Sequence, residues 1–169
     1  MKNLVKTVLA ITIAIAGLTA CGGNSEQEEA RLKRKAEFEK KVAEESKVPA
    51  SERITLDNKG VGPVKNVELS AQIDEEMVTR GQKLFKTNCT ACHKVDKRFI
   101  GPSPKGIMKR RSPEWIMNMI LNPQEMVEKD RCAKDLLVEF NGAAMANQNL
   151  TREQARDILE YFRTLKDES

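Results

Sequence analysis

The chain of 169 residues has a single histidine, which directly follows a Cys-x-x-Cys pair in the sequence CTACH at residues 89–93. Two thiols at this spacing can add across the two vinyl groups of a haem, and the imidazole of His93 can then bind the iron as the proximal axial ligand. Cys89, Cys92 and His93 are therefore the candidate residues for covalent attachment of one haem c with its iron.

Two other chemistries use a Cys-x-x-Cys pair. A structural zinc site needs four ligands, and beyond the CTACH residues only Cys132 could supply another soft ligand. A redox dithiol of the thioredoxin type would be expected within a βαβ unit, whereas the sequence around residues 89–93 has the pattern of helices. The histidine next to the second cysteine favours haem over both alternatives.

Residues 1–21 predict export of the chain. Lys2 and Lys6 precede an apolar run over residues 8–16, which is typical of a signal peptide and short for a membrane span. The segment ends in LTAC, which resembles the bacterial lipobox, where cleavage precedes the cysteine and its sulfur receives a diacylglycerol. We therefore expect residues 1–20 to be a lipoprotein signal peptide and Cys21 to anchor the exported protein to a membrane, facing the periplasm. A plain secretory signal is the alternative, and it also exports the chain.

Residues 1–20 carry two of the 29 basic residues and none of the 25 acidic ones, so the rest of the chain is nearly neutral. This charge balance gives no indication of a nucleic-acid partner. Residues 21–49 are dense in Glu, Lys and Arg and cannot bury a core, which indicates a lipid-anchored charged tether. A partly helical spacer is favoured, and a flexible charged spacer is the alternative. Residues 50–73 combine β-branched residues with turn signals, and we expect an extended arm, with or without a short hairpin, lying against the following domain.

Residues 74–169 have the pattern of a small all-α domain. Asp74 is a candidate N-cap for a helix that runs to Asn88, and Ser112 caps a second helix that ends before Pro123. A third helix is expected from residue 130 to residue 140, and a fourth opens at the capping box formed by residues 151 and 154. Four modest helices form a limited core, which a large apolar group such as haem would complete.

Residues 74–166 resemble a class I cytochrome c. The resemblance is carried by a helix with Gly81 and Phe85 ahead of CTACH, by GPSPKG at 101–106, and by MANQNLTREQARDILEYFRTL at 145–165. It implies the class I cytochrome c fold, in which the first and last helices cross closely. Gly81 would allow the close approach, with Phe85 and Tyr161 packed at the crossing.

The resemblance also implies roles around the haem. The carbonyl of Pro102 would accept a hydrogen bond from the proximal imidazole and fix its orientation. Trp115 would donate its indole N–H to a haem propionate, as in some relatives, or else be a buried core residue. The basic run KRR at 109–111 would neutralise a propionate, face an acidic partner or lie in solvent.

The sixth iron ligand has to come from a residue other than histidine. A methionine thioether is soft enough to bind low-spin iron, and the candidates are Met77, Met108, Met117, Met119, Met126 and Met145. Most of these are expected to fill the core, including Met77, Met117 and Met119 on helices. The family places its ligand in the irregular segment ahead of the last helix, which implies Met145 here. Met126 and a vacant or otherwise filled sixth position are the alternatives.

A His/Met iron predicts a mono-haem electron carrier and not an enzyme. Together with the lipobox, it predicts a membrane-tethered protein that passes single electrons from a donor complex to a periplasmic or membrane reductase. The stretches KGVGPVKNVELS and RRSPEWIMNMILNP are similar to tethered cytochromes of Bacteroidetes-type bacteria that accompany nitrous-oxide reductase, which implies a role in respiration. A terminal oxidase, with this protein as its electron-transfer subunit, is the alternative partner. The alternative function is that of a haem sensor, or a gas-binding or peroxidase-like protein, with a vacant iron site.

Overall fold

The computed structural model describes residues 25–45 and 47–166, and the chain divides into two units, 1–42 and 43–169. Helix α1 (Ser25–Glu45) accounts for the described part of the first unit. Its large apolar residues Leu32 and Phe38 are exposed, and Glu29 pairs with Lys33 one turn along, as expected of a charged helix with no buried stripe. The expected helical content of residues 21–49 is confirmed, whereas Cys21 and the signal segment lie outside the described residues.

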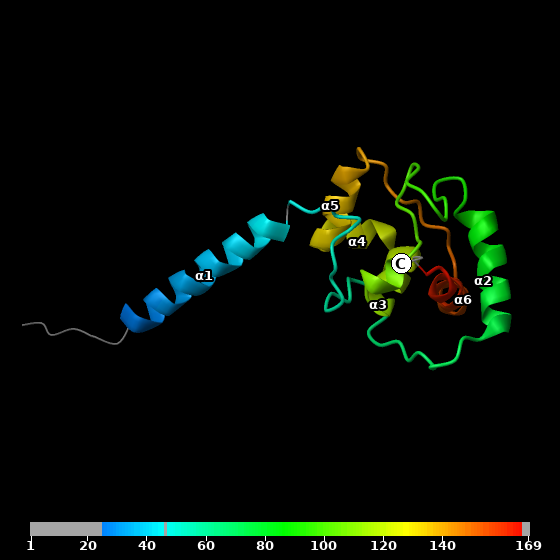
Figure 1. The fold of residues 1–169 in the computed structure, drawn as a ribbon, viewed down its shortest axis with the longest axis horizontal. Coiled ribbons are helices and arrows are strands. Elements are labelled where there is room, and N and C mark those ends of the chain that lie inside the picture. The colour runs from blue at the N-terminus through cyan, green and yellow to red at the C-terminus, as the bar shows by residue number, and fades with distance from the viewer. Residues whose placement is uncertain (1–24, 46, 167–169) are drawn as a thin grey trace, which may run out of the picture. The chain divides into compact units, whose positions relative to one another are not determined.

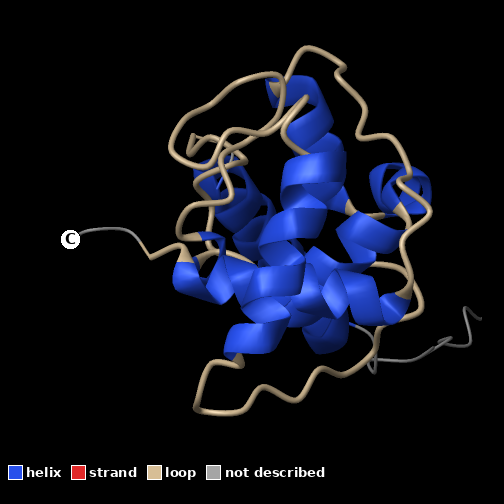
Figure 2. Cartoon of the chain, turned by 90° about the vertical axis from the view of Figure 1, so that its right-hand side faces the viewer, coloured by secondary structure: helices blue, strands red, loops and turns tan. Residues whose placement is uncertain are grey.

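The second unit is built from helices, some joined by long loops and others separated by a single residue (Figure 1). They are α2 (Glu75–Asn88), the short 3₁₀ helix η1 (Ile107–Lys109), α3 (Pro113–Leu121), α4 (Pro123–Lys129), α5 (Arg131–Glu139) and α6 (Arg152–Thr164). Figure 2 shows no strand in the described part of the chain. None of the described helices has the length and apolar character needed to cross a membrane.

The four helices expected in this domain are confirmed, and so are the three caps predicted at Asp74, Ser112 and Thr151. The side chains of Asp74, Ser112, Asp130 and Thr151 accept backbone N–H groups at the starts of α2, α3, α5 and α6. Helix α4 was not predicted, because Pro123 was interpreted only as the end of the preceding helix. The same proline also occupies the first turn of the next helix, where its missing N–H costs nothing.

The crossing of α2 and α6 forms the centre of the core, as the resemblance implied. Gly81 lies so close to α6 that a Cβ atom on it would be 2.0 Å from the carbonyl oxygen of Asp157. The ring of Phe85 lies 5.7 Å from that of Tyr161 and 5.7 Å from that of Phe162, in tilted and edge-on arrangements that favour aromatic contact. These rings extend the helix contact toward the loop that carries CTACH.

The arm, residues 50–73, lies against α3 and α4. The described residues contain no hairpin there, and the only β-bridge pairs Thr55 with Arg111 outside the arm. Side chains of the helices form hydrogen bonds with the backbone of the arm instead. Asn118 accepts the N–H of Val64 at 2.9 Å and donates to the Val64 carbonyl at 2.9 Å. Val64 is fully buried. The hairpin is thus unnecessary, because the backbone groups of the arm find partners on the domain.

Candidate haem site

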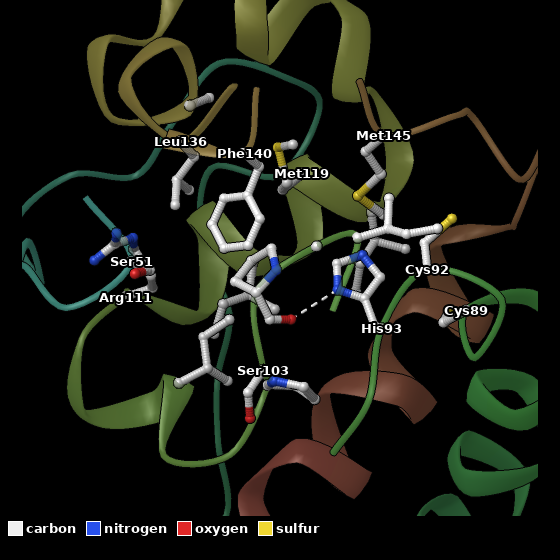
Figure 3. A pocket seen from close by; sticks show the side chains of 18 of the residues that line it. Ser51, Cys89, Cys92, His93, Ser103, Arg111, Met119, Leu136, Phe140 and Met145 are labelled. Carbon is white, nitrogen blue, oxygen red and sulfur yellow. Dashed lines mark hydrogen bonds between the residues drawn. The ribbon is translucent and has the colours of Figure 1, made fainter. Parts of the chain in front are cut away.

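A mostly apolar cavity lies between the loops that follow α2 and α5 and the helices α3, α5 and α6. All six residues expected to hold or orient the cofactor line this cavity: Cys89, Cys92, His93, Pro102, Trp115 and Met145. Figure 3 shows Phe140 and Leu136 among the apolar side chains of its wall. A wall of this kind suits a large planar apolar group and excludes water from it.

The end of α2 places the CTACH residues at one end of the cavity. Cys89 follows the last helical residue, and its carbonyl accepts the N–H of Cys92 at 3.1 Å and that of His93 at 2.8 Å. This single turn brings both thiols and the imidazole to one wall. Burial, with a smaller contribution from Cys92, raises the pKa of the Cys89 thiol to about 11, so at neutral pH this thiol carries its proton.

The two alternative uses of the cysteines find no support in the described residues. No three His, Cys, Asp or Glu side chains there converge on a point where a metal ion could bind. Cys132 is buried but does not line the cavity. No βαβ unit surrounds Cys89 and Cys92 within the part of the chain that the structure describes.

The imidazole of His93 is oriented by its neighbours. Its Nδ1 donates to the carbonyl oxygen of Pro102 at 2.8 Å, which is the hydrogen bond implied by the resemblance (Figure 3). A carbonyl only accepts, so Nδ1 carries the proton and Nε2 keeps a free lone pair for a metal. Figure 3 shows this second ring nitrogen directed to the side on which Met145 lies.

Gly101 is a further determinant of the imidazole position that the sequence pattern did not single out. A Cβ atom on this residue would lie 2.5 Å from Cε1 of His93, so only glycine leaves the ring its place. The Gly101 N–H donates to the Cys92 carbonyl at 2.9 Å and ties the loop to the CTACH turn. The sequence could have indicated this role, because Gly101 directly precedes Pro102, the residue expected to bind the imidazole.

Among the methionines of the described residues, only Met119 and Met145 line the cavity. Met126 is excluded as an iron ligand, because it is fully buried elsewhere and its sulfur accepts the N–H of Val61 at 3.0 Å. Met119 was assigned to core packing, yet it is only half-buried and its sulfur faces the same cavity (Figure 3). The irregular segment between α5 and α6 carries Met145, whereas Met119 is held on α3.

Trp115 does not have the role expected at a propionate. Its indole N–H donates to Oδ1 of Asp130 at 3.0 Å, and the same carboxylate oxygen accepts the Ala133 N–H at the start of α5. The side chain is buried, so its single hydrogen is already used and the core interpretation holds. Trp115 lines the cavity without a free N–H to offer to it.

The basic run at residues 109–111 contains one buried member. Lys109 is exposed and Arg110 is half-buried, whereas Arg111 is buried and lines the cavity. In Figure 3, Arg111 and Ser51 lie on the opposite side of the cavity from Cys89 and Cys92. The cavity wall thus has two thiols at one end and a guanidinium at the other, with an imidazole and two thioethers between these ends. The thiols, the imidazole and a thioether are the groups that hold haem c.

Comparisons with known proteins agree with this geometry. The family model described as Cytochrome c matches residues 78–166. A cytochrome c-553-like protein from Synechocystis is 34% identical over 62 residues, covering 29% of this chain and 59% of that protein. Cytochrome c2 from Rhodopseudomonas palustris is 25% identical over 111 residues, covering 52% of this chain and 96% of that protein.

Solved structures show the same likeness. A cytochrome c from Rhodothermus marinus is 44% identical and superposes with a TM-score of 0.60, covering 69% of this chain and 93% of that one. An engineered form of that cytochrome c, bound to a carbene intermediate, is likewise 44% identical, with a TM-score of 0.58 and coverage of 69% of this chain and 94% of that one.

Proposed function

This chain belongs to the cytochrome c family, and on that premise we propose that it is a membrane-tethered electron carrier with His93 and Met145 as the axial ligands of its haem iron. The family binds haem c covalently and transfers electrons to redox partners. Cys89 and Cys92 would form the two thioether bonds. When bound, the haem supplies a one-electron couple between ferrous and ferric iron.

The orientation of His93 carries the proposal. The 2.8 Å hydrogen bond to Pro102 holds the proton on Nδ1 and raises the basicity of the nitrogen that would bind iron. Gly101 leaves room for the ring in this orientation, because a Cβ atom there would lie 2.5 Å from Cε1 of His93. Met145 as the second ligand would favour the reduced iron and would leave no open position for a substrate, which is the chemistry of electron transfer and not of gas binding or peroxidase-like reactions.

The axial ligands are tested by the absorption spectrum of the oxidised protein, purified with its haem attached. We expect a weak sulfur-to-iron band near the red limit of the visible, and its loss in Met145→Ala together with carbon monoxide binding to the ferrous iron. Met119→Ala is the matched control and should keep the band. Loss of the band in Met119→Ala alone would move the ligand to α3, and absence of the band in the wild type would favour a vacant site.

The membrane tether is the second part of the proposal. Cys21 would carry the lipid and residues 21–49 would space the haem domain from the bilayer on its periplasmic side. The exposed, charged surface of α1 supports a solvated spacer. Cys21→Ser should release the protein from the membrane fraction of cells, and its retention there would show that another segment anchors it.

The proposed electron acceptor is nitrous-oxide reductase, with a terminal oxidase as the alternative. Support comes from the likeness of residues 59–70 and 110–123 to tethered cytochromes that accompany that reductase. The test is to mix the reduced protein with each purified acceptor and to follow haem oxidation. Rapid oxidation by the reductase and slow oxidation by the oxidase is the expected result, and the reverse order would assign the oxidase.

A further inference from the structure

We propose that Met119 is an oxidation site inside the haem cavity: a small hydroperoxide converts its thioether to a sulfoxide, and the new polar oxygen releases Met145 from the iron. The carrier thereby loses its sixth iron ligand under oxidising conditions and regains it when the sulfoxide is reduced. This inference rests on the proposed function, because it requires a haem in the cavity with Met145 bound to its iron.

The cavity contains one thioether more than an iron atom already bound to His93 can use. Met119 and Met145 both line the cavity, and Figure 3 shows both sulfur atoms at the upper side of the view, above the imidazole. A sulfur bound to iron shares a lone pair with the metal and is less available to an oxidant. In the described part of the chain no N–H or O–H donates to the sulfur of Met119, whereas that of Met126 accepts the Val61 N–H.

Burial distinguishes Met119 from the other described methionines. Met117 on the same helix is 1% exposed, and Met126 is fully buried outside the cavity. Met77 and Met108 are half-buried and do not line the cavity, so oxidation there adds no polar atom to the haem site. Susceptibility to oxidation follows exposure, and Met119 combines a half-buried side chain with a place in the cavity.

Small side chains form the rim of the cavity beside Met145. Ala143, Ala144 and Ala146 line the cavity and are exposed, and so is Gly142 ahead of them. Side chains of this size cover little of the space behind them. A molecule as small as hydrogen peroxide therefore enters the cavity without a movement of any helix.

The reaction at Met119 is a two-electron oxidation of its sulfur. A sulfur lone pair attacks one oxygen of hydrogen peroxide, the O–O bond breaks, and an S–O bond forms. The second oxygen leaves as water and carries both hydrogens, so the peroxide is reduced by two electrons. Methionine sulfoxide reductases reverse this modification, which makes it a switch as well as a lesion.

A sulfoxide oxygen on Met119 finds no hydrogen-bond donor among the neighbouring side chains of α3. Ile116 and Ile120 line the cavity with it and are apolar, and the indole N–H of Trp115 is already donated to Asp130. A polar oxygen without a partner in an apolar site costs free energy until a neighbouring segment moves or water enters.

The segment that carries Met145 is the part of the site that yields. Among the described residues, no backbone hydrogen bond joins residues 144–150 to another element, and the hydrogen bonds of Gln148 and Asn149 stay within the segment. Helix α3, by contrast, is held by its own backbone hydrogen bonds and by six buried residues. The sulfoxide and the water that it attracts therefore displace the Met145 segment, and the iron loses its thioether.

The first test locates the oxidation. The ferric protein with haem attached is treated with a small molar excess of hydrogen peroxide and digested, and the sulfoxide at each methionine is quantified by mass spectrometry over time. We expect Met119 to be oxidised several times faster than Met117, which lies on the same helix outside the cavity, and faster than Met145. Equal rates at Met119 and Met117, or faster oxidation of Met145, would overturn the assignment.

The second test measures the consequence with Met119→Leu and the matched control Met117→Leu. Leucine has nearly the volume of methionine and cannot be oxidised in this way. After peroxide treatment we expect the wild type and Met117→Leu to lose the sulfur-to-iron band and to bind carbon monoxide when reduced, while Met119→Leu retains the band. A methionine sulfoxide reductase should restore the band in the wild type. Equal loss of the band in Met119→Leu, or its persistence in wild type whose Met119 is oxidised, would overturn the coupling.

The spectrum before treatment tests the iron ligand separately. A wild type that lacks the band before peroxide is added would refute the proposed function. An untreated Met119→Leu variant without the band would show that Met119 is itself the iron ligand. A band that is present at first and survives oxidation of Met119 overturns only the switch.

Discussion

Replacing Gly81 with alanine tests whether the close approach of α2 and α6 holds the domain together. In an exposed helix the change would stabilise by about 0.8–1 kcal/mol, because glycine loses more backbone entropy on folding than alanine. At this position the new Cβ would lie 2.0 Å from the carbonyl oxygen of Asp157. A backbone oxygen cannot rotate away, so one helix has to move.

The movement would disturb the best-packed part of the core. Arg80, next to Gly81, donates to the two carboxylate oxygens of Asp157 at 2.9 Å each, and Phe85, one turn further along α2, packs on Tyr161 and Phe162. Overpacking of a core costs about 1–3 kcal/mol. After the gain in helix propensity we expect Gly81→Ala to lower the free energy of unfolding by up to about 2 kcal/mol.

Urea unfolding of the protein with haem attached, followed by helical circular dichroism, measures this change. A second pair, Gln82→Ala and Gln82→Gly, reports the alanine–glycine difference at the adjacent exposed position of the same helix. The reasoning requires opposite signs at the two positions, with alanine stabilising at residue 82 and destabilising at residue 81. If Gly81→Ala were as stable as the wild type or more so, the crossing would tolerate the Cβ and the steric argument would be refuted.

Three further changes probe the site. Cys89→Ala with Cys92→Ala should abolish covalent haem, so a haem-stained band that persists on a denaturing gel would contradict the attachment. Gly101→Ala places a Cβ 2.5 Å from the His93 ring and should weaken the bond to Pro102, which makes the imidazole less basic and raises the reduction potential; an unchanged potential and spectrum would show that the loop yields instead. Burial raises the pKa of Glu139, but hydrogen bonds from Ser51 and the nearby Arg98 outweigh it and hold that pKa below its ordinary value. Because the pKa of Glu139 is lowered in the folded state, its contribution to stability is complete above the ordinary carboxyl pKa and is lost as the pH falls through the lowered pKa. Glu139→Gln should therefore flatten the acid side of a profile of unfolding free energy against pH. An unaltered profile would assign the acid sensitivity to other groups.

Signals that act over one helical turn were sufficient to predict most of the secondary structure. The caps at Asp74, Ser112 and Thr151 work through hydrogen bonds to residues two or three positions away, so they can be recognised without the fold. Helix α4 shows the limit of such signals, because Pro123 serves as a stop for one helix and a start for the next. The haem motif is equally local, since its two thiols and imidazole lie on one turn.

The partners of the polar side chains could not be predicted in this way. Trp115 was expected either to donate to a propionate or to be a core residue, and the sequence could not choose, because its indole N–H is used by Asp130, a residue brought close by the turn from α4 into α5. Met119 was expected to fill the core and Met126 was the alternative iron ligand. The structure reverses these positions, because the arm packs onto Met126 and Met119 lines the cavity.

The sequence by itself determined that this protein has a haem-attachment turn, a helical domain around it and a charged segment before it, because spacing and periodicity along the chain specify these. Only the tertiary structure decided which thioethers face the cavity and that Arg111, alone in its basic run, is buried there. Burial and counter-charge depend on residues distant in sequence. The arm supplies the acceptors for Arg111 from residues 50 and 53, and no local pattern around residue 111 encodes that contact.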